Sequence, residues 1–227
     1  MKKIAFIPTR HEDSELEICK YFSKNGWTPR VLSNRSSIFS AFKDAVEEEK
    51  IGPNDYVIFC HDDIRILTDP EIFNEIISHE LEKKETGFLG VAGTKLLNQT
   101  AVWWDGLNRV PKAPLAGHVY HGNDIHNMTS TSYGPHGRVV VMDGLFLVAK
   151  GSVLNTMQLS KPKFFEGDWD FYDIFYTMQT HLKGLHNKVI PISILHESFG
   201  ELAGRDSWTK NREAFIKRFW DKLPLSV

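Results

Sequence analysis

The order of strand-like and helix-like segments is the feature that most constrains the fold of this chain. Short apolar runs predict strands at 4–7, 28–34 and 55–60, and the residues between them carry apolar side chains at helical spacing. Strands that alternate with helices form a largely parallel sheet covered on both faces. The sequence therefore predicts an α/β fold with a mostly parallel sheet flanked by helices, which begin near Ser14, near Ser36 or Ser37, and at Asp69 with Pro70.

The central predicted strand ends in a group of polar residues. The sequence from Tyr56 reads YVIFCHDDIRIL, so His61, Asp62 and Asp63 follow the apolar run directly. Sheets of this kind bind ligands beyond the carboxyl ends of their strands. Neighbouring carboxylates repel each other unless a cation lies between them, and carboxylates with an added imidazole suit Mn²⁺ or Mg²⁺. The group predicts a metal site, with residues that only solvate the strand end as the alternative.

Composition limits the classes of protein that remain. The 227 residues, 41% of them hydrophobic and 25% charged, suit a single domain over 1–227 with a sizeable core. A formal net charge of -2 provides no general basic surface, so nucleic acid is not expected as a partner. Cys19 and Cys60 are too few for a disulfide framework, which favours a cytoplasmic location. No run approaches the roughly 18 apolar residues of a membrane-spanning helix, so we expect peripheral membrane contact at most.

Several common enzyme signatures are absent from the sequence. The stretch PTRHED, after the first predicted strand, contains no glycine, so the Gly-x-Gly-x-x-Gly fingerprint of dinucleotide-binding folds is missing there. No P-loop, His-Glu-x-x-His, Cys-x-x-Cys or Gly-x-Ser-x-Gly motif occurs either. These absences disfavour the usual dehydrogenases, P-loop enzymes and serine hydrolases.

Residues 98–138 lack a regular apolar pattern and are expected to form one long functional loop. Flat aromatic rings cover the apolar faces of sugars, so Trp103 and Trp104 are candidates to line a sugar site, with core packing as the alternative. The spacing of the histidines in this segment matches no tight zinc pattern. These histidines are His118, His121, His126 and His136.

Spaced segments along most of the chain resemble a known family. In order they read SIFSAFKDAVEE, NDYVIFCHDDIRI, GVAGTKLL, WW, LAGHVYHG, VMDGLFLVAKGSVL, WDFYDIFYTMQTHLKG and VIPISILHESFG. Together they resemble the bacterial glycosyltransferase-like proteins of the GT-A fold, which are allied to family 2 glycosyltransferases. The resemblance implies an enzyme that uses Mn²⁺ or Mg²⁺ to move a sugar from a nucleotide diphosphate, UDP being the common case, to a hydroxyl of a glycan or another acceptor, as in polysaccharide synthesis.

The resemblance also implies roles for individual residues on the donor side. HDDI resembles the family's variant of the Asp-x-Asp motif, which makes Asp63 a metal ligand, and LHESFG resembles the late strand whose histidine, here His196, returns to the same metal. His61 and Asp62 fall on the sugar-nucleotide side of the motif. The positions where this fold holds the base and ribose are occupied by Pro8, Thr9, Arg10 and Asn34.

On the acceptor side, Asp173 in DFYDIF matches the family's general base, which deprotonates the acceptor hydroxyl and suggests inversion at the anomeric carbon; the alternative is a carboxylate that caps the helix. Asp170 stands where the family more often has histidine, Phe175 where an acidic residue often follows, and Lys43 where asparagine is frequent, which affects acceptor recognition most. The 98–138 loop is then expected on the acceptor side. The implied acceptor or sugar contacts are Trp103, Trp104, Asp143, Gly144, Glu166 and Asp170.

Two other classes of function remain open at this point. A nucleotidyltransferase or another metal-dependent nucleotide enzyme also has an acidic strand end, although the glycine-rich, basic phosphate loop of such enzymes is not evident near residue 8. A catalytically silent module that binds sugar nucleotides would keep the same metal and donor residues. Formation of a transfer product separates an enzyme from such a module.

Overall fold

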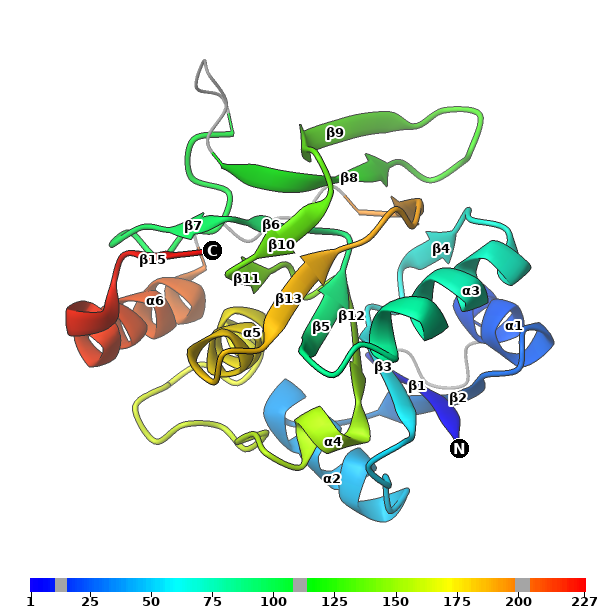
Figure 1. Ribbon diagram of the computed structural model, residues 1–227, viewed down its shortest axis with the longest axis horizontal. Helices are drawn as coiled ribbons and strands as arrows, with labels where there is room; N and C mark the ends of the chain where they lie inside the picture. Colours follow the sequence, from blue (N-terminus) through cyan, green and yellow to red (C-terminus); the bar gives the residue numbers. More distant parts are fainter. Residues whose placement is uncertain (11–15, 108–113, 199–204) are drawn as a thin grey trace.

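The main sheet has seven strands in the order β10-β13-β5-β12-β3-β1-β2 (Figure 1). The structure is a computed structural model, and it describes residues 1–10, 16–107, 114–198 and 205–227. The strands of this sheet are β1 (Lys3–Thr9), β2 (Thr28–Ser33), β3 (Tyr56–Cys60), β5 (Thr86–Gly90), β10 (Gly137–Val139), β12 (Phe146–Lys150) and β13 (His186–Val189).

The strand directions confirm the α/β class but correct the expectation of a mostly parallel sheet. Strand β1 runs parallel to β2 and β3, and β13 runs parallel to β5, whereas β12 is antiparallel to both of its neighbours and β10 is antiparallel to β13. Parallel neighbours need a long crossover connection, usually a helix. Strand β12 instead follows a short turn after β11 (Val141–Met142), which belongs to the second sheet. The chain therefore enters the main sheet at β12 from the end opposite to that at which β3 and β5 begin.

A second sheet of six strands corrects the expectation of one long loop over 98–138. Its order is β11-β6-β8-β14-β4, and β9 pairs with β8 to make a hairpin at the top of Figure 1. Three of the six residues of β9 are exposed and none is buried, so an apolar pattern could not reveal this strand. The strands not yet given are β4 (Ile64–Ile66), β6 (Ala92–Thr94), β8 (Leu115–His121), β9 (Thr129–Gly134) and β14 (Ile194–His196), with a separate pair, β7 (Leu96–Leu97) and β15 (Leu225–Ser226).

Two helices, α2 and α3, begin where the sequence signals predicted. Ser37 caps α2, because its hydroxyl accepts a hydrogen bond from the Phe39 N–H at 3.2 Å. Asp69 caps α3 in the same way, and Pro70 occupies its first turn. Ser14 lies outside the described residues. The helices are α1 (Glu17–Lys24), α2 (Ile38–Glu48), α3 (Pro70–Leu81), α4 (Gly151–Leu154), α5 (Tyr172–Leu182) and α6 (Asp206–Phe219), followed by the 3-10 turn η1 (Trp220–Lys222).

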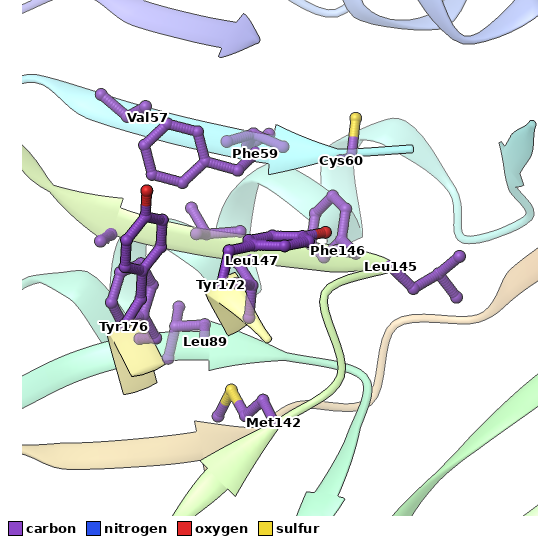
Figure 2. Packing of buried hydrophobic residues seen from close by; sticks show 14 of the residues in the cluster. Val57, Phe59, Cys60, Leu89, Met142, Leu145, Phe146, Leu147, Tyr172 and Tyr176 are labelled. Atoms are coloured by element: carbon purple, nitrogen blue, oxygen red, sulfur yellow. The ribbon is translucent and has the colours of Figure 1, made fainter. Parts of the chain in front are cut away.

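The core fixes the strand ends on which the polar residues stand. Phe59 of β3 and Leu147 of β12 are completely buried and pair across the sheet, and Tyr176 of α5 packs beside them (Figure 2). Burying one large apolar side chain stabilises the fold by about 1.5–3 kcal/mol, so the end of β3 has a rigid base. Among the described helices, none combines the length and the apolar composition that a bilayer crossing needs.

Candidate active site

A pocket of about 320 Å³ opens beyond the carboxyl ends of β1 and β3, where the parallel part of the sheet predicts a ligand site. Its other walls come from the turn between β11 and β12, the start of α5, the residues after β7 and the start of α6. From the predicted donor and metal residues, the pocket is lined by Pro8, Thr9, Arg10, His61, Asp62, Asp63 and His196. From the predicted catalytic and acceptor residues, it is lined by Trp103, Trp104, Asp143, Gly144, Asp170 and Asp173.

Two imidazoles and a carboxylate meet at one end of the pocket. One nitrogen of His61, one of His196 and a carboxylate oxygen of Asp63 all lie within 4.8 Å of one another. Asp63 Oδ2 is 3.3 Å from His196 Nε2, and Asp63 Oδ1 is 3.7 Å from His61 Nδ1. Strand β14 pairs with β4 so that His196 lies opposite Ile64, which brings residues from distant parts of the chain together. We call His61, Asp63 and His196 the triad.

The charge states of the triad fit a divalent cation. Asp63 Oδ1 is buried and has no hydrogen-bond partner, which leaves a carboxylate oxygen available in the middle of the group. Burial would raise the pKa of Asp63, but the contacts with His196, His61 and Ser198 outweigh burial and hold that pKa at about 2. Burial lowers the pKa of His61 and favours the neutral imidazole that a metal requires. One carboxylate and two imidazoles are a ligand set that can hold a divalent metal ion.

Asp173 lies in the same pocket in a different environment. Its Oδ2 accepts a hydrogen bond from the Gly144 N–H at 3.0 Å, and its Oδ1 accepts one from the Ile174 N–H at 2.8 Å. Burial, and next the nearby carboxylate of Asp143, raise the pKa of Asp173 to about 7 in spite of these two donors. A carboxylate with this pKa can accept a proton near neutral pH.

The tryptophans divide between the core and the pocket surface. Trp103 is 3% exposed and packs against Tyr133, with ring centroids 5.1 Å apart, so core packing describes most of its side chain. Trp104 is half-buried and lies 5.6 Å from the ring of Trp208 in α6. Trp169, whose ring faces the Arg10 guanidinium at 5.9 Å, completes the aromatic wall of the pocket.

Sequence reasoning did not identify every residue that lines the pocket. Trp169 and Tyr172 could have been identified from the sequence, because each is next to a predicted site residue, Asp170 or Asp173, in WDFYD. Trp208 and Arg205 lie beyond the last segment that resembles the family, and no local pattern marks them. The residues missed are Ile38, Cys60, Trp169, Phe171, Tyr172, Ile174, Ser198, Arg205 and Trp208.

Two predicted contacts are not brought into the pocket. Asn34 is exposed at the end of β2, and Glu166 is exposed and pairs with Lys210, whose Nζ lies 3.8 Å from it. Asp170 does line the pocket, but its Oδ2 accepts a hydrogen bond from the Ser207 hydroxyl at 2.6 Å. Asp170 therefore also stabilises the first turn of α6. The contacts with Lys210 and Ser207 therefore account for Glu166 and Asp170, two of the acidic residues before α5.

Of the histidines in 98–138, His121 comes nearest to the triad. It is paired in register with His196 across β8 and β14, and the two ring centroids are 5.8 Å apart. It does not belong to the group whose ligand atoms lie within 4.8 Å of one another. Within the described residues, the triad is the group of histidine, cysteine and acidic side chains with metal-ligand spacing.

Comparison with known proteins assigns the class. Residues 30–219 match the model of a glycosyltransferase-like family, and this chain belongs to that family. Among solved structures, A197 from STIV is similar to it with a TM-score of 0.54 and 15% identity, covering 87% of this chain and 86% of that chain. The crystal structure of GalNAc-T7 with UDP, GalNAc and Mn²⁺ is similar with a TM-score of 0.57 and 9% identity. It matches 97% of this chain, which spans 49% of the GalNAc-T7 chain. Comparison with curated proteins gives no match.

Proposed function

We propose that this protein is a metal-dependent glycosyltransferase of the GT-A type, which moves a sugar from a nucleoside diphosphate to an acceptor hydroxyl. The observation that carries the proposal is that the triad and the weakly acidic Asp173 line one pocket at the carboxyl ends of β1 and β3. The family match supports the sugar-transfer chemistry. The similarity to GalNAc-T7, a structure that contains UDP and Mn²⁺, supports UDP as the first nucleotide to test.

His61, Asp63 and His196 would hold the cation. A bound Mn²⁺ or Mg²⁺ would neutralise the diphosphate and make it a better leaving group. Asp63 brings the negative charge that attracts the cation, and the two imidazoles add ligands without adding negative charge. Asp62, Pro8, Thr9 and Arg10 line the same side of the pocket and are assigned to the nucleotide.

Asp173 acts as the general base. The acceptor oxygen forms a bond to the anomeric carbon while its proton passes to the Asp173 carboxylate. The bond between the anomeric carbon and the diphosphate oxygen breaks, and its electron pair leaves with the diphosphate. An acceptor that attacks from the side opposite the leaving group gives inversion of configuration.

The aromatic wall is assigned to the sugars. Trp104, Trp169 and Trp208 line the pocket without being fully buried, so their rings are available to an incoming ligand. Such rings cover the apolar faces of pyranoses, while neighbouring polar groups such as Asp143 receive the hydroxyls. The acceptor is then a glycan or another molecule that presents a hydroxyl group.

The test has two stages. First, a thermal-shift panel of nucleoside diphosphates is measured with and without Mn²⁺; a ligand at 100 times its dissociation constant adds about 2.7 kcal/mol of stability. Second, UDP-sugars are incubated with a panel of hydroxyl acceptors, and products are followed by mass spectrometry. Binding that depends on Mn²⁺ together with a sugar-transfer product is expected. Binding without any product would leave a silent sugar-nucleotide module, and release of diphosphate from a nucleoside triphosphate would favour a nucleotidyltransferase.

A further inference from the structure

The hydroxyl of Tyr172 lies between the triad and the turn that carries Asp143 and Gly144. Its oxygen is 3.0 Å from the carbonyl oxygen of Gly144 and 3.3 Å from Nε2 of His61. Tyr172 is 6% exposed and packs among apolar side chains, with its hydroxyl towards the end of the cluster where Cys60 and Leu145 lie (Figure 2). The hydroxyl is therefore held in place by packing.

The single hydroxyl proton of Tyr172 determines which group donates in each of the two hydrogen bonds. A carbonyl oxygen can only accept, so the single hydroxyl proton of Tyr172 is donated to Gly144. The hydroxyl oxygen then presents a lone pair to His61, and the contact is favourable only if His61 Nε2 carries a proton. A neutral imidazole has one N–H, so the Nδ1 of His61 is left with a free lone pair.

The nitrogen of His61 that keeps its lone pair, Nδ1, faces the other members of the triad. Nδ1 is the atom that lies 3.7 Å from Asp63 Oδ1, the buried carboxylate oxygen without a hydrogen-bond partner. We propose that Tyr172 is a positioning residue that holds His61 in its Nε2–H tautomer and so presents Nδ1 to a divalent cation. The inference rests on the proposed metal site, and it assigns to a residue outside the triad the task of preparing a ligand.

The same hydroxyl connects the metal side of the pocket to the base. Gly144 accepts from Tyr172 through its carbonyl and donates to Asp173 through its N–H. A Cβ at position 144 would lie 2.2 Å from the Tyr172 hydroxyl, so glycine is required for this approach. Phe171, just before α5, adopts a left-handed backbone with φ of 68°, and both residues that follow it line the pocket.

The test compares two tyrosines of the same helix. Tyr172→Phe removes only the hydroxyl, and we expect the dissociation constant for Mn²⁺ alone, measured by calorimetry without nucleotide, to rise ~10- to 100-fold. Tyr176→Phe is the matched control, because Tyr176 is also buried and its hydroxyl donates to the Leu159 carbonyl oxygen at 2.6 Å, away from the triad. The control is expected to keep the wild-type affinity for Mn²⁺.

A second measurement shows directly which nitrogen of His61 carries the proton. Nitrogen NMR of the metal-free full chain at about pH 8, above the ordinary histidine pKa of about 6.5, should show His61 protonated at Nε2. In Tyr172→Phe the population should shift towards the Nδ1–H form, while Tyr176→Phe should match the wild type.

The outcomes separate this inference from the proposed function. Wild-type Mn²⁺ affinity together with an unchanged His61 tautomer in Tyr172→Phe would overturn the role of Tyr172 and leave the metal site intact. Absence of Mn²⁺ binding by the wild type, both alone and with a nucleoside diphosphate, would overturn the proposed function instead, and the NMR spectrum would still show which nitrogen of His61 carries the proton. If Tyr172→Phe does not fold, an Nδ1–H form of His61 in the wild type overturns the inference.

Discussion

The pocket places two carboxylates in opposite environments. Asp63 contacts imidazoles, and these contacts outweigh burial and hold its pKa at about 2. Asp173 accepts hydrogen bonds from backbone N–H groups, but burial and the nearby Asp143 raise its pKa to about 7. At neutral pH the first is fully ionised, and the second exists in both forms.

The difference shows how one pocket can divide two tasks between residues of the same type. A carboxylate that stays ionised is suited to a cation, and one whose pKa lies near the working pH is suited to proton transfer. Pairs of titratable groups whose pKa values are separated in this way are typical of sites with acid-base chemistry. The comparison therefore predicts different consequences when each carboxylate is changed.

The largest effect is expected from Asp63→Ala. This change removes the negative charge from the triad, so the Mn²⁺-dependent stabilisation by a nucleoside diphosphate should disappear, a loss of about 2.7 kcal/mol for a ligand at 100 times its dissociation constant. Thermal shift with and without Mn²⁺ measures the effect. Asp44→Asn is the control, because this surface carboxylate pairs with Arg35 at 3.7 Å and lies outside the pocket. A full metal-dependent shift in Asp63→Ala would show that Asp63 is not a ligand.

The next effect is expected from Asp173→Asn. The amide keeps the shape of the side chain but cannot accept the proton, so sugar transfer should slow by ~100- to 10,000-fold. Donor and Mn²⁺ should still bind, which calorimetry can measure separately. Transfer close to the wild-type rate would exclude Asp173 as the base, and lost donor binding would move Asp173 to the donor side. In the first case Asp170 becomes the next carboxylate to test, since it also lines the pocket.

A smaller effect is expected from His196→Ala. As a proposed imidazole ligand, His196 brings no negative charge and can be replaced by a water molecule, so the affinity for Mn²⁺ should fall by ~10- to 100-fold, less than in Asp63→Ala. Titration of Mn²⁺ by calorimetry gives both values on one scale. Unchanged affinity would mean that the contact between His196 and Asp63 serves the pairing of β14 with β4 and not the metal.

The sequence predicted the triad side of the pocket better than the aromatic side. His61 and Asp63 follow a buried strand directly, so a local pattern pointed to a metal site there. The resemblance to the family named Asp63 and His196 as ligands and Asp173 as the base, but it assigned His61 to the sugar-nucleotide side and not to the metal. Trp208 reaches the pocket only because α6 folds back on it, and β9 has no buried side chain that could give an apolar pattern. The pKa of Asp173 is raised by burial and next by Asp143, which is far from it in sequence, so the spacing of residues could not predict this pKa.

The smallest effect on the transfer rate is that of pH, and it tests the comparison itself. Because Asp173 must be ionised to accept a proton, kcat/KM for transfer, which reports the free enzyme, should rise about tenfold per pH unit below about 7 and level off above it. Stability should change in the opposite direction. The folded-state pKa of Asp173 lies above the ordinary value of about 3.9, so the folded protein binds this proton more tightly, and the associated stability is present below about pH 4 and lost as pH rises through about 7.

Asp173→Asn removes this loss of stability, so the free energy of unfolding of the variant relative to the wild type should increase between about pH 4 and pH 7, by on the order of 2–4 kcal/mol. Urea unfolding of both proteins across this range measures the difference. A constant difference at every pH would mean that the pKa of Asp173 is ordinary, and that the two carboxylates of the pocket do not differ as their environments require.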